Sequence, residues 1–155
     1  MNYIGIKEKA ITETVATLNI LLANYHVYYQ NLRNYHWNIN GEHFFDLHEK
    51  FEDLYNDAKM SIDEIAERIL TLRMKPVSTL KEYLEISSVK ELKAENSRTM
   101  VDNILENHKI LIDLMRNTID KAGKADDEGT IDLIAGFLAN IEKKSWMLDA
   151  WNSKS

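Results

Sequence analysis

Two pairs of side chains in the first half of the chain have the residue types and the spacing of metal ligands. His48 and Glu52 are four residues apart, and so are Asp63 and Glu67. Side chains four residues apart are neighbours on an α-helix, so each pair could bind one ion. His36, in the turn before this helix, could add a third ligand to the first pair. Imidazole with carboxylate suits iron, zinc or manganese and is a poor set for calcium.

The two pairs lie too far apart along one helix to hold the same ion. Fifteen residues separate His48 from Asp63, which corresponds to about 22 Å of helical rise. At about 100° per residue, however, both pairs fall on the same flank of the apolar stripe. Two such helices packed antiparallel about a two-fold axis would set His48 and Glu52 of one chain opposite Asp63 and Glu67 of the other. The pattern therefore predicts two equivalent metal sites at a dimer interface.

The same residues also have a simpler explanation. Charged pairs at this spacing often form a solvated helix face, and Asp63 and Glu67 could pair with nearby cations at Lys59 and Arg68. The chain would then be a non-catalytic helical assembly protein. A di-iron site inside the bundle fits poorly, because such sites use E-x-x-H motifs and none of the five histidines completes one. Neighbouring aromatic residues are expected in the core or at an interface: Trp37, Phe44, Phe45 and Tyr55.

Four long helical patterns position these residues. Apolar side chains recur every three or four residues over about 9–35, 42–72, 97–121 and 130–151. Short connections follow the first and third helices, whereas about two dozen residues join the second to the third. In this crossover Pro76 ends the second helix, and Thr79 with Glu82 forms a capping box for a short helix. A crossover of this length can return along a whole helix, which predicts an all-α, ferritin-like four-helix bundle.

The composition favours a single helical domain over residues 1–155. Five glycines and one proline are few for this length, which disfavours a turn-rich β architecture. The absence of cysteine excludes disulfides and thiolate metal sites and fits a reducing cytoplasm. The N-terminal segment has no signal-peptide pattern, and no stretch approaches membrane-spanning length. We therefore expect a cytoplasmic protein without membrane partners.

The segment from His36 to Arg68 resembles the signature of the Dps family, the miniferritins. The matching spacing is H-x11-H-x3-[DE]-x10-D-x3-E, and the similarity continues over nearly the whole chain. The resemblance implies a four-helix subunit assembled as a hollow dodecamer. Such cages oxidise ferrous iron, characteristically with hydrogen peroxide, and store it as a ferric mineral, which protects DNA and the cell from oxidative damage. A cage that binds another divalent metal, such as zinc, is the alternative, because zinc accepts the same ligands.

Carried over residue by residue, the resemblance assigns the catalytic and iron-binding roles. One chain would supply His36, His48 and Glu52, and its partner would supply Asp63 and Glu67. Glu52 stands where many family members carry aspartate, and the longer side chain changes the reach of this ligand. Trp37 follows the first histidine, as the family pattern expects, and would lie against the iron site.

An acidic stretch before the fourth helix is a second candidate for cation binding. In the family, comparable carboxylates line threefold pores, and Asp127, Glu128 and Asp132 are the matching positions. A ring of such carboxylates would attract Fe(II). An alternative remains for Asp132, because a carboxylate in a first helical turn also interacts favourably with the helix dipole.

Direct DNA binding is not expected. Family members that bind DNA usually do so through a mobile lysine-rich tail. Here the N-terminal segment offers only Lys7 and Lys9, and the last five residues contain Lys154 alone. The chain carries a net charge of −6, so a homo-oligomer of many copies would repel the DNA phosphates.

Overall fold

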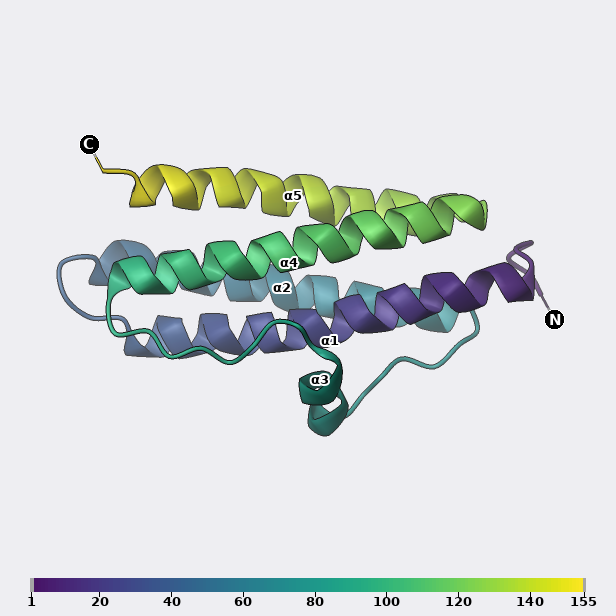
Figure 1. The fold of residues 1–155 in the computed structure, drawn as a ribbon, viewed down its shortest axis with the longest axis horizontal. Coiled ribbons are helices and arrows are strands. Elements are labelled where there is room, and N and C mark those ends of the chain that lie inside the picture. Colours follow the sequence, from purple (N-terminus) through teal and green to yellow (C-terminus); the bar gives the residue numbers. More distant parts are fainter. Residues whose placement is uncertain (1, 155) are drawn as a thin grey trace.

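The computed structural model describes residues 2–154, and this part of the chain contains five helices and no strand. Their bounds are α1 Glu8–Asn38, α2 Phe44–Thr71, α3 Leu80–Ile86, α4 Ser97–Lys124 and α5 Glu128–Asn152. The long helices α1, α2, α4 and α5 form a bundle, and α3 stands outside it beside α1 (Figure 1). The predicted four-helix bundle with a short helix in the crossover is confirmed.

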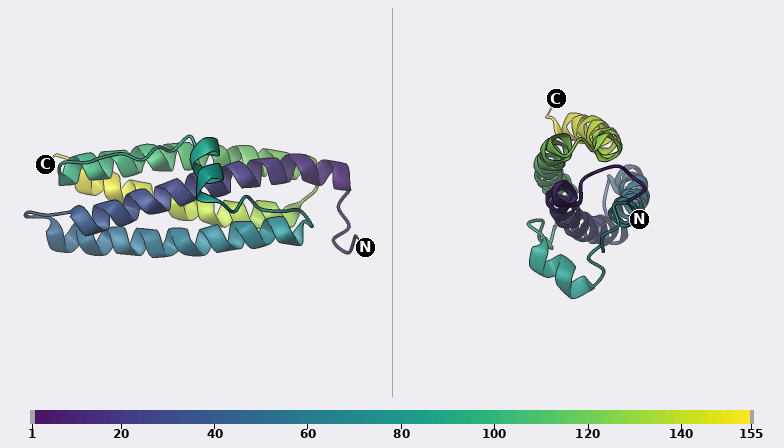
Figure 2. Two further views of the ribbon diagram at one scale, coloured as in Figure 1. Left: turned by 90° about the horizontal axis from the view of Figure 1, so that it is seen from below. Right: turned by 90° about the vertical axis from the view of Figure 1, so that its right-hand side faces the viewer.

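The direction of each helix follows from the two kinds of connection. Short turns join α1 to α2 and α4 to α5, so each of these pairs is antiparallel (Figure 1). The crossover runs back along the bundle, so α2 and α4 point the same way. Seen along the bundle, the four long helices surround a common core and α3 projects from the side (Figure 2). One long crossover is the connectivity of ferritin-like bundles.

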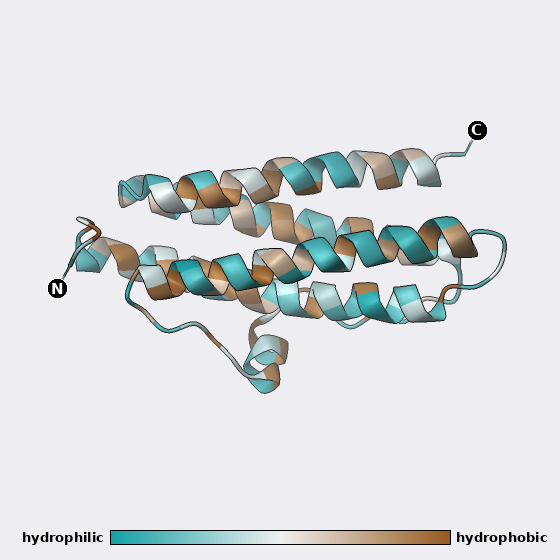
Figure 3. Ribbon diagram, turned by 180° about the vertical axis from the view of Figure 1, so that it is seen from behind, coloured by the Kyte–Doolittle hydropathy of each residue, from teal (hydrophilic) through white to brown (hydrophobic). Residues whose placement is uncertain are grey.

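The helix α2 separates apolar from polar side chains along its length. Its buried apolar residues recur at helical spacing: Leu47, Phe51, Leu54, Ala58, Ile65 and Ile69. They pack in one continuous core with the apolar faces of the other long helices. The opposite face of α2 is largely hydrophilic (Figure 3). This separation leaves the flank of α2 that carries the candidate ligands outside the core.

Polar side chains of α1 hold the crossover against the bundle. The Asn24 side-chain oxygen accepts hydrogen bonds from the backbone N–H groups of Ser88 and Val89, both at 2.9 Å. The Tyr35 hydroxyl donates to the Leu92 carbonyl at 3.0 Å. Similar bonds join Asn19 to Val77 and Asn31 to Lys90. The crossover is thus fixed by hydrogen bonds that satisfy its backbone in the absence of regular structure.

The helix ends carry the expected signals. The Thr79 side chain caps α3 by accepting from the Glu82 backbone N–H at 3.3 Å, which confirms the predicted role of Thr79 at the start of the short helix. At the far end of the chain, the Trp151 indole donates to Asp46 at 2.9 Å and ties the end of α5 to the start of α2.

None of the helices built from residues 2–154 has the length and hydropathy needed to cross a membrane.

Candidate metal centre

His36 and His48 are brought together from two different helices. His36 lies in the last turn of α1 and His48 near the start of α2, and their rings stack with centroids 3.8 Å apart. The Nδ1 atom of each ring lies 2.7 Å from the backbone carbonyl oxygen of the other residue. A carbonyl oxygen can only accept, so each Nδ1 must carry the hydrogen. In the neutral rings, both Nε2 atoms therefore keep a free lone pair, the form that binds a metal.

Aromatic side chains hold this histidine pair on both sides. Phe44 stacks on His48 with ring centroids 4.8 Å apart, and Tyr55 meets His36 edge-on at 5.3 Å. His36 is buried, whereas His48 is half-buried and lies nearer the surface. The packing and the two hydrogen bonds together fix the orientation of both rings. Such support of a ligand's orientation is typical of metal-binding histidines.

The three candidate carboxylates stand exposed along the same helix. Glu52 lies one turn beyond His48, and Asp63 and Glu67 lie further along α2, which is unbroken between the two groups. The predicted separation of about 22 Å along the axis therefore holds. Over residues 2–154, no cluster of three or more histidine, aspartate or glutamate side chains is placed to hold an ion. One protomer thus presents two separate groups of candidate ligands.

Arg68 does not pair with the candidate ligands beside it. Its guanidinium Nη2 lies 2.6 Å from Asp127 Oδ1, and its Nε donates to the Thr130 hydroxyl at 2.9 Å. Within the described part of the chain, no ion pair engages Glu52, Asp63 or Glu67. The alternative in which Arg68 neutralises Asp63 or Glu67 is therefore wrong for the protomer, and their charges stay available.

Asp127 is buried as the N-cap of α5. Its Oδ1 accepts from the Thr130 backbone N–H at 3.0 Å as well as from Arg68, and its Oδ2 accepts from the Thr130 hydroxyl at 2.6 Å. The side chain is 1% exposed. The prediction that Asp127 binds cations does not fit this position, because both oxygens already have partners and face the interior. A carboxylate at an N-cap is the ordinary structural solution here.

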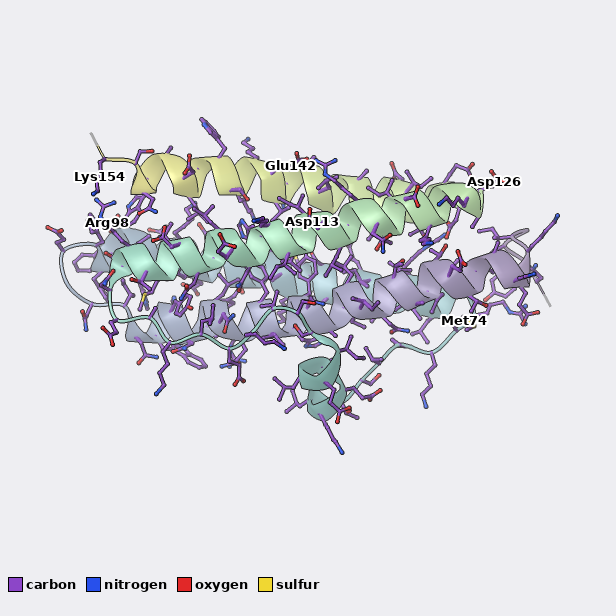
Figure 4. All side chains as sticks on the ribbon, viewed as in Figure 1. Met74, Arg98, Asp113, Asp126, Glu142 and Lys154 are labelled. Atoms are coloured by element: carbon purple, nitrogen blue, oxygen red, sulfur yellow. The ribbon has the colours of Figure 1, made fainter. Side chains whose placement is uncertain are left out.

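The other two candidate ligands of this acidic stretch, Glu128 and Asp132, are exposed. They lie at the end of the bundle where α4 turns into α5, next to Asp126, which Figure 4 labels. Asp132 shares a shallow surface hollow with Glu64 and Glu67 of α2. Exposed carboxylates of this kind attract cations to the surface. Of the three candidate ligands in the acidic stretch, one is thus structural and two are free to face solvent.

Trp37 points away from the histidine pair within the protomer. Its side chain is 57% exposed, and the Arg33 guanidinium lies 4.7 Å from its ring centroid. It lines a surface hollow together with Leu92 and Lys93 of the crossover. Successive residues of a helix point about 100° apart, which explains why Trp37 does not follow His36 toward the site. Within a single subunit, Trp37 therefore does not lie against the candidate iron site, where it was predicted.

Tyr55 lies at the candidate site, although its sequence pattern predicts only a packing role. Its ring contacts His36, and the Glu52 carboxylate is close enough to influence the pKa of its hydroxyl. Burial is the largest cause that raises the pKa of Tyr55, and the negative charge of Glu52 is the next. On a helical wheel Tyr55 falls beside His48, and this position could have indicated from the sequence that it lies at the site.

Comparisons with known proteins extend these observations. A family model described as a ferritin-like domain matches residues 15–154. The "DNA protection during starvation protein" of Porphyromonas gingivalis is 43% identical over 97% of this chain and 95% of that protein. The general stress protein 20U of Bacillus subtilis is 41% identical over 90% of this chain and 97% of its own length.

Solved structures agree closely with this fold. The crystal structure of the Dps protein from Vibrio cholerae O1, described as a member of a superfamily of ferritin-like diiron-carboxylate proteins, has a TM-score of 0.95 and 40% identity. The match covers 99% of this chain and 97% of that one. A Dps structure from Listeria innocua, soaked with zinc, has a TM-score of 0.88 and 35% identity over 92% of this chain and 97% of its own.

Proposed function

Because this chain belongs to the Dps family of ferritin-like proteins, we propose that it is a ferroxidase that oxidises Fe(II) and stores the ferric product. The observation that carries the proposal is the histidine pair. His36 and His48 are held by each other's carbonyl groups so that both Nε2 atoms are left for a metal. The proposed assembly is a dodecameric cage in the cytoplasm, formed from single-domain subunits and acting without direct DNA binding.

The proposed iron site is shared between two subunits. His36, His48 and Glu52 of one protomer would face Asp63 and Glu67 of its partner across a two-fold axis. The unbroken course of α2 supports this arrangement, since it keeps the two groups too far apart to meet within one chain. The exposure of the three carboxylates supports it as well. A two-fold contact would complete two equivalent sites at once.

The ligand set suits the oxidation of iron. Neutral imidazole and carboxylate both bind Fe(II), and the negative charge of three carboxylates favours the more highly charged Fe(III) product. Hydrogen peroxide would take one electron from each of two ferrous ions and, with two protons, leave as two water molecules. This two-electron reduction releases no hydroxyl radical, which is the protective outcome.

The exposed carboxylates of the acidic stretch are the proposed route for iron. Glu128 and Asp132 would attract Fe(II) at a threefold pore, and the hollow that Asp132 shares with Glu67 would continue the acidic surface along α2. Asp127 would act indirectly, because its bonds to Arg68 and Thr130 fix the start of α5 and so the position of Glu128.

Subunit complementation tests the proposed shared site directly. Neither His48→Ala nor Asp63→Ala protein should oxidise iron efficiently by itself. After the two variants are unfolded together and reassembled, each mixed dimer keeps one complete site, so peroxide-driven oxidation should recover to about a quarter of the wild-type rate. The matched control mixes His48→Ala with Glu52→Ala, which damage the same half of the site and should not recover.

The competing explanations give different results in the same assay. A non-catalytic assembly protein would show no saturable Fe(II) binding and no effect of either substitution. A zinc-binding cage would bind Zn(II) tightly but would produce no ferric absorbance with Fe(II) and peroxide. A wild-type protein that stays monomeric in light scattering and still oxidises iron at full rate would contradict the shared site.

A further inference from the structure

Tyr55 lies between two candidate ligands that belong to the same half of the proposed site. Its half-buried ring meets His36 edge-on, with centroids 5.3 Å apart and planes at 79°. It also meets Tyr29 edge-on, with centroids 5.9 Å apart and planes at 85°. The ring of Tyr55 is therefore held between α1 and its own helix, α2, and it forms one wall of the space occupied by His36.

Glu52 precedes Tyr55 by three residues on α2, a spacing at which side chains are neighbours on the helix surface. Burial is the largest cause that raises the pKa of the Tyr55 hydroxyl, and the negative charge of Glu52 raises it further. Glu52 itself is exposed and forms no ion pair within residues 2–154. A glutamate in this situation has several rotamers, and binding a metal requires that one of them be selected at a cost in entropy.

We propose that Tyr55 is a positioning residue of the iron centre, which braces the His36 ring and donates its hydroxyl hydrogen bond to the Glu52 carboxylate. One side chain would then orient two ligands from different helices before the metal binds. This inference rests on the proposed function, since it concerns the same site. Groups that orient metal ligands in this way typically change metal affinity by about 10–100-fold.

Two substitutions separate the two contacts of Tyr55. Tyr55→Phe keeps the ring against His36 and removes the hydroxyl, whereas Tyr55→Leu removes both. We expect Tyr55→Phe to weaken Co(II) binding about tenfold, and Tyr55→Leu to weaken it further. The probe is Co(II), titrated into the assembled protein and followed by its visible absorption. In iron oxidation, Tyr55→Phe should raise the KM for Fe(II) more than it lowers kcat.

The matched control is another tyrosine that packs on a histidine. Tyr83 of α3 stacks on His26 with ring centroids 3.8 Å apart, away from the site. Tyr83→Phe removes a hydroxyl in the same way and should leave both Co(II) affinity and the KM for Fe(II) unchanged. Light scattering and circular dichroism establish that every variant compared is folded and assembled.

A double substitution tests the contact between the hydroxyl and Glu52. In a Glu52→Asp background we expect the shorter carboxylate to lose its contact with the Tyr55 hydroxyl, so Tyr55→Phe should change Co(II) affinity by less than about twofold. An equal loss in the wild-type and Glu52→Asp backgrounds would overturn the inference, because the hydroxyl would then act elsewhere.

Different results would overturn the role of Tyr55 and the proposed iron site. Wild-type Co(II) affinity in Tyr55→Phe, together with clear weakening in Glu52→Gln, would overturn the role of Tyr55 and leave the iron site standing. Wild-type affinity and wild-type iron oxidation in Tyr55→Phe, Glu52→Gln and His48→Ala alike would overturn both proposals.

Discussion

The buried His108 and the histidine pair of the candidate site share a tautomer, but they differ in whether the second ring nitrogen, Nε2, remains free to bind a metal. His108 is buried on α4, with its Nδ1 at 2.8 Å from the Ser145 hydroxyl and its Nε2 at 2.8 Å from the Tyr28 hydroxyl. Because Ser145 donates its own hydrogen to the Ile141 carbonyl, it accepts from His108 Nδ1, and Nε2 accepts from Tyr28. The histidine pair at the candidate site also carries hydrogen on Nδ1, but its Nε2 atoms are left for a metal.

The burial of His108 also determines its protonation. Burial, with a smaller contribution from the Lys144 charge, lowers the pKa of His108 to about 3. His108 therefore stays neutral and serves the packing of the bundle. A histidine's role therefore depends on the group that faces its second ring nitrogen. The same holds for carboxylates, since Asp127 has both oxygens occupied whereas Asp63 is exposed.

The largest expected effect comes from removing a ligand of the histidine pair. His48→Ala deletes one imidazole, its hydrogen bond to the His36 carbonyl and its stacking on the His36 ring, whereas the bond from His36 Nδ1 to the backbone carbonyl of residue 48 remains. We expect peroxide-driven iron oxidation to fall by more than about 100-fold, beyond the loss usual for a supporting residue. Stopped-flow ferric absorbance measures the rate, and circular dichroism checks that the bundle is intact. A wild-type rate would remove His48 from the mechanism.

In contrast to His48→Ala, His108→Gln should alter the stability of the bundle and leave iron oxidation unchanged. The folded pKa of about 3 lies below the ordinary 6.5, so the unfolded chain takes up the proton first. Stability should therefore fall as the pH drops from about 6.5 toward about 3, by about 1.4 kcal/mol per pH unit from this group. Glutamine does not titrate, so the difference between wild type and variant should shrink or reverse as the pH falls.

Urea denaturation at a series of pH values measures this difference. The analogous variant His48→Gln serves as the control, because it removes a titratable ring from the candidate site while leaving His108 in place. Parallel pH profiles for wild type and His108→Gln would show that His108 is not held neutral by burial. Loss of iron oxidation in folded His108→Gln would contradict the assignment of His108 to packing alone.

The smallest effects distinguish the carboxylates of the acidic stretch. Asp127→Asn breaks the ion pair with Arg68 in a largely buried place, and we expect a loss of about 2 kcal/mol in stability. Asp132→Asn should leave stability within about 0.5 kcal/mol of wild type and slow iron uptake a few-fold at low salt. Denaturation and the uptake rate measure the two outcomes. Equal stability losses in both variants would contradict the structural role given to Asp127 alone.

Much of the fold could be predicted from local pattern. The apolar spacing placed the four long helices within a few residues of their bounds, and Thr79 with Glu82 marked the short one. The length of the crossover indicated that α2 and α4 run in parallel, and the spacing of His48, Glu52, Asp63 and Glu67 placed the candidate ligands on one helix flank. The bonds from Asn24 and Tyr35 to the crossover were not foreseen, since their partners lie far along the chain.

Helical periodicity is a local property, so the helices, their order and the spacing of the candidate ligands follow from the sequence. Hydrogen-bond partners from distant segments are decided only when the helices pack. The tertiary structure alone therefore decided that His36 and His48 bond to each other's carbonyl groups, that Asp127 is buried against Arg68, and that Tyr55 reaches His36. The residue types determine which chemistry is possible, and the packing of the helices determines which atoms remain free to take part in it.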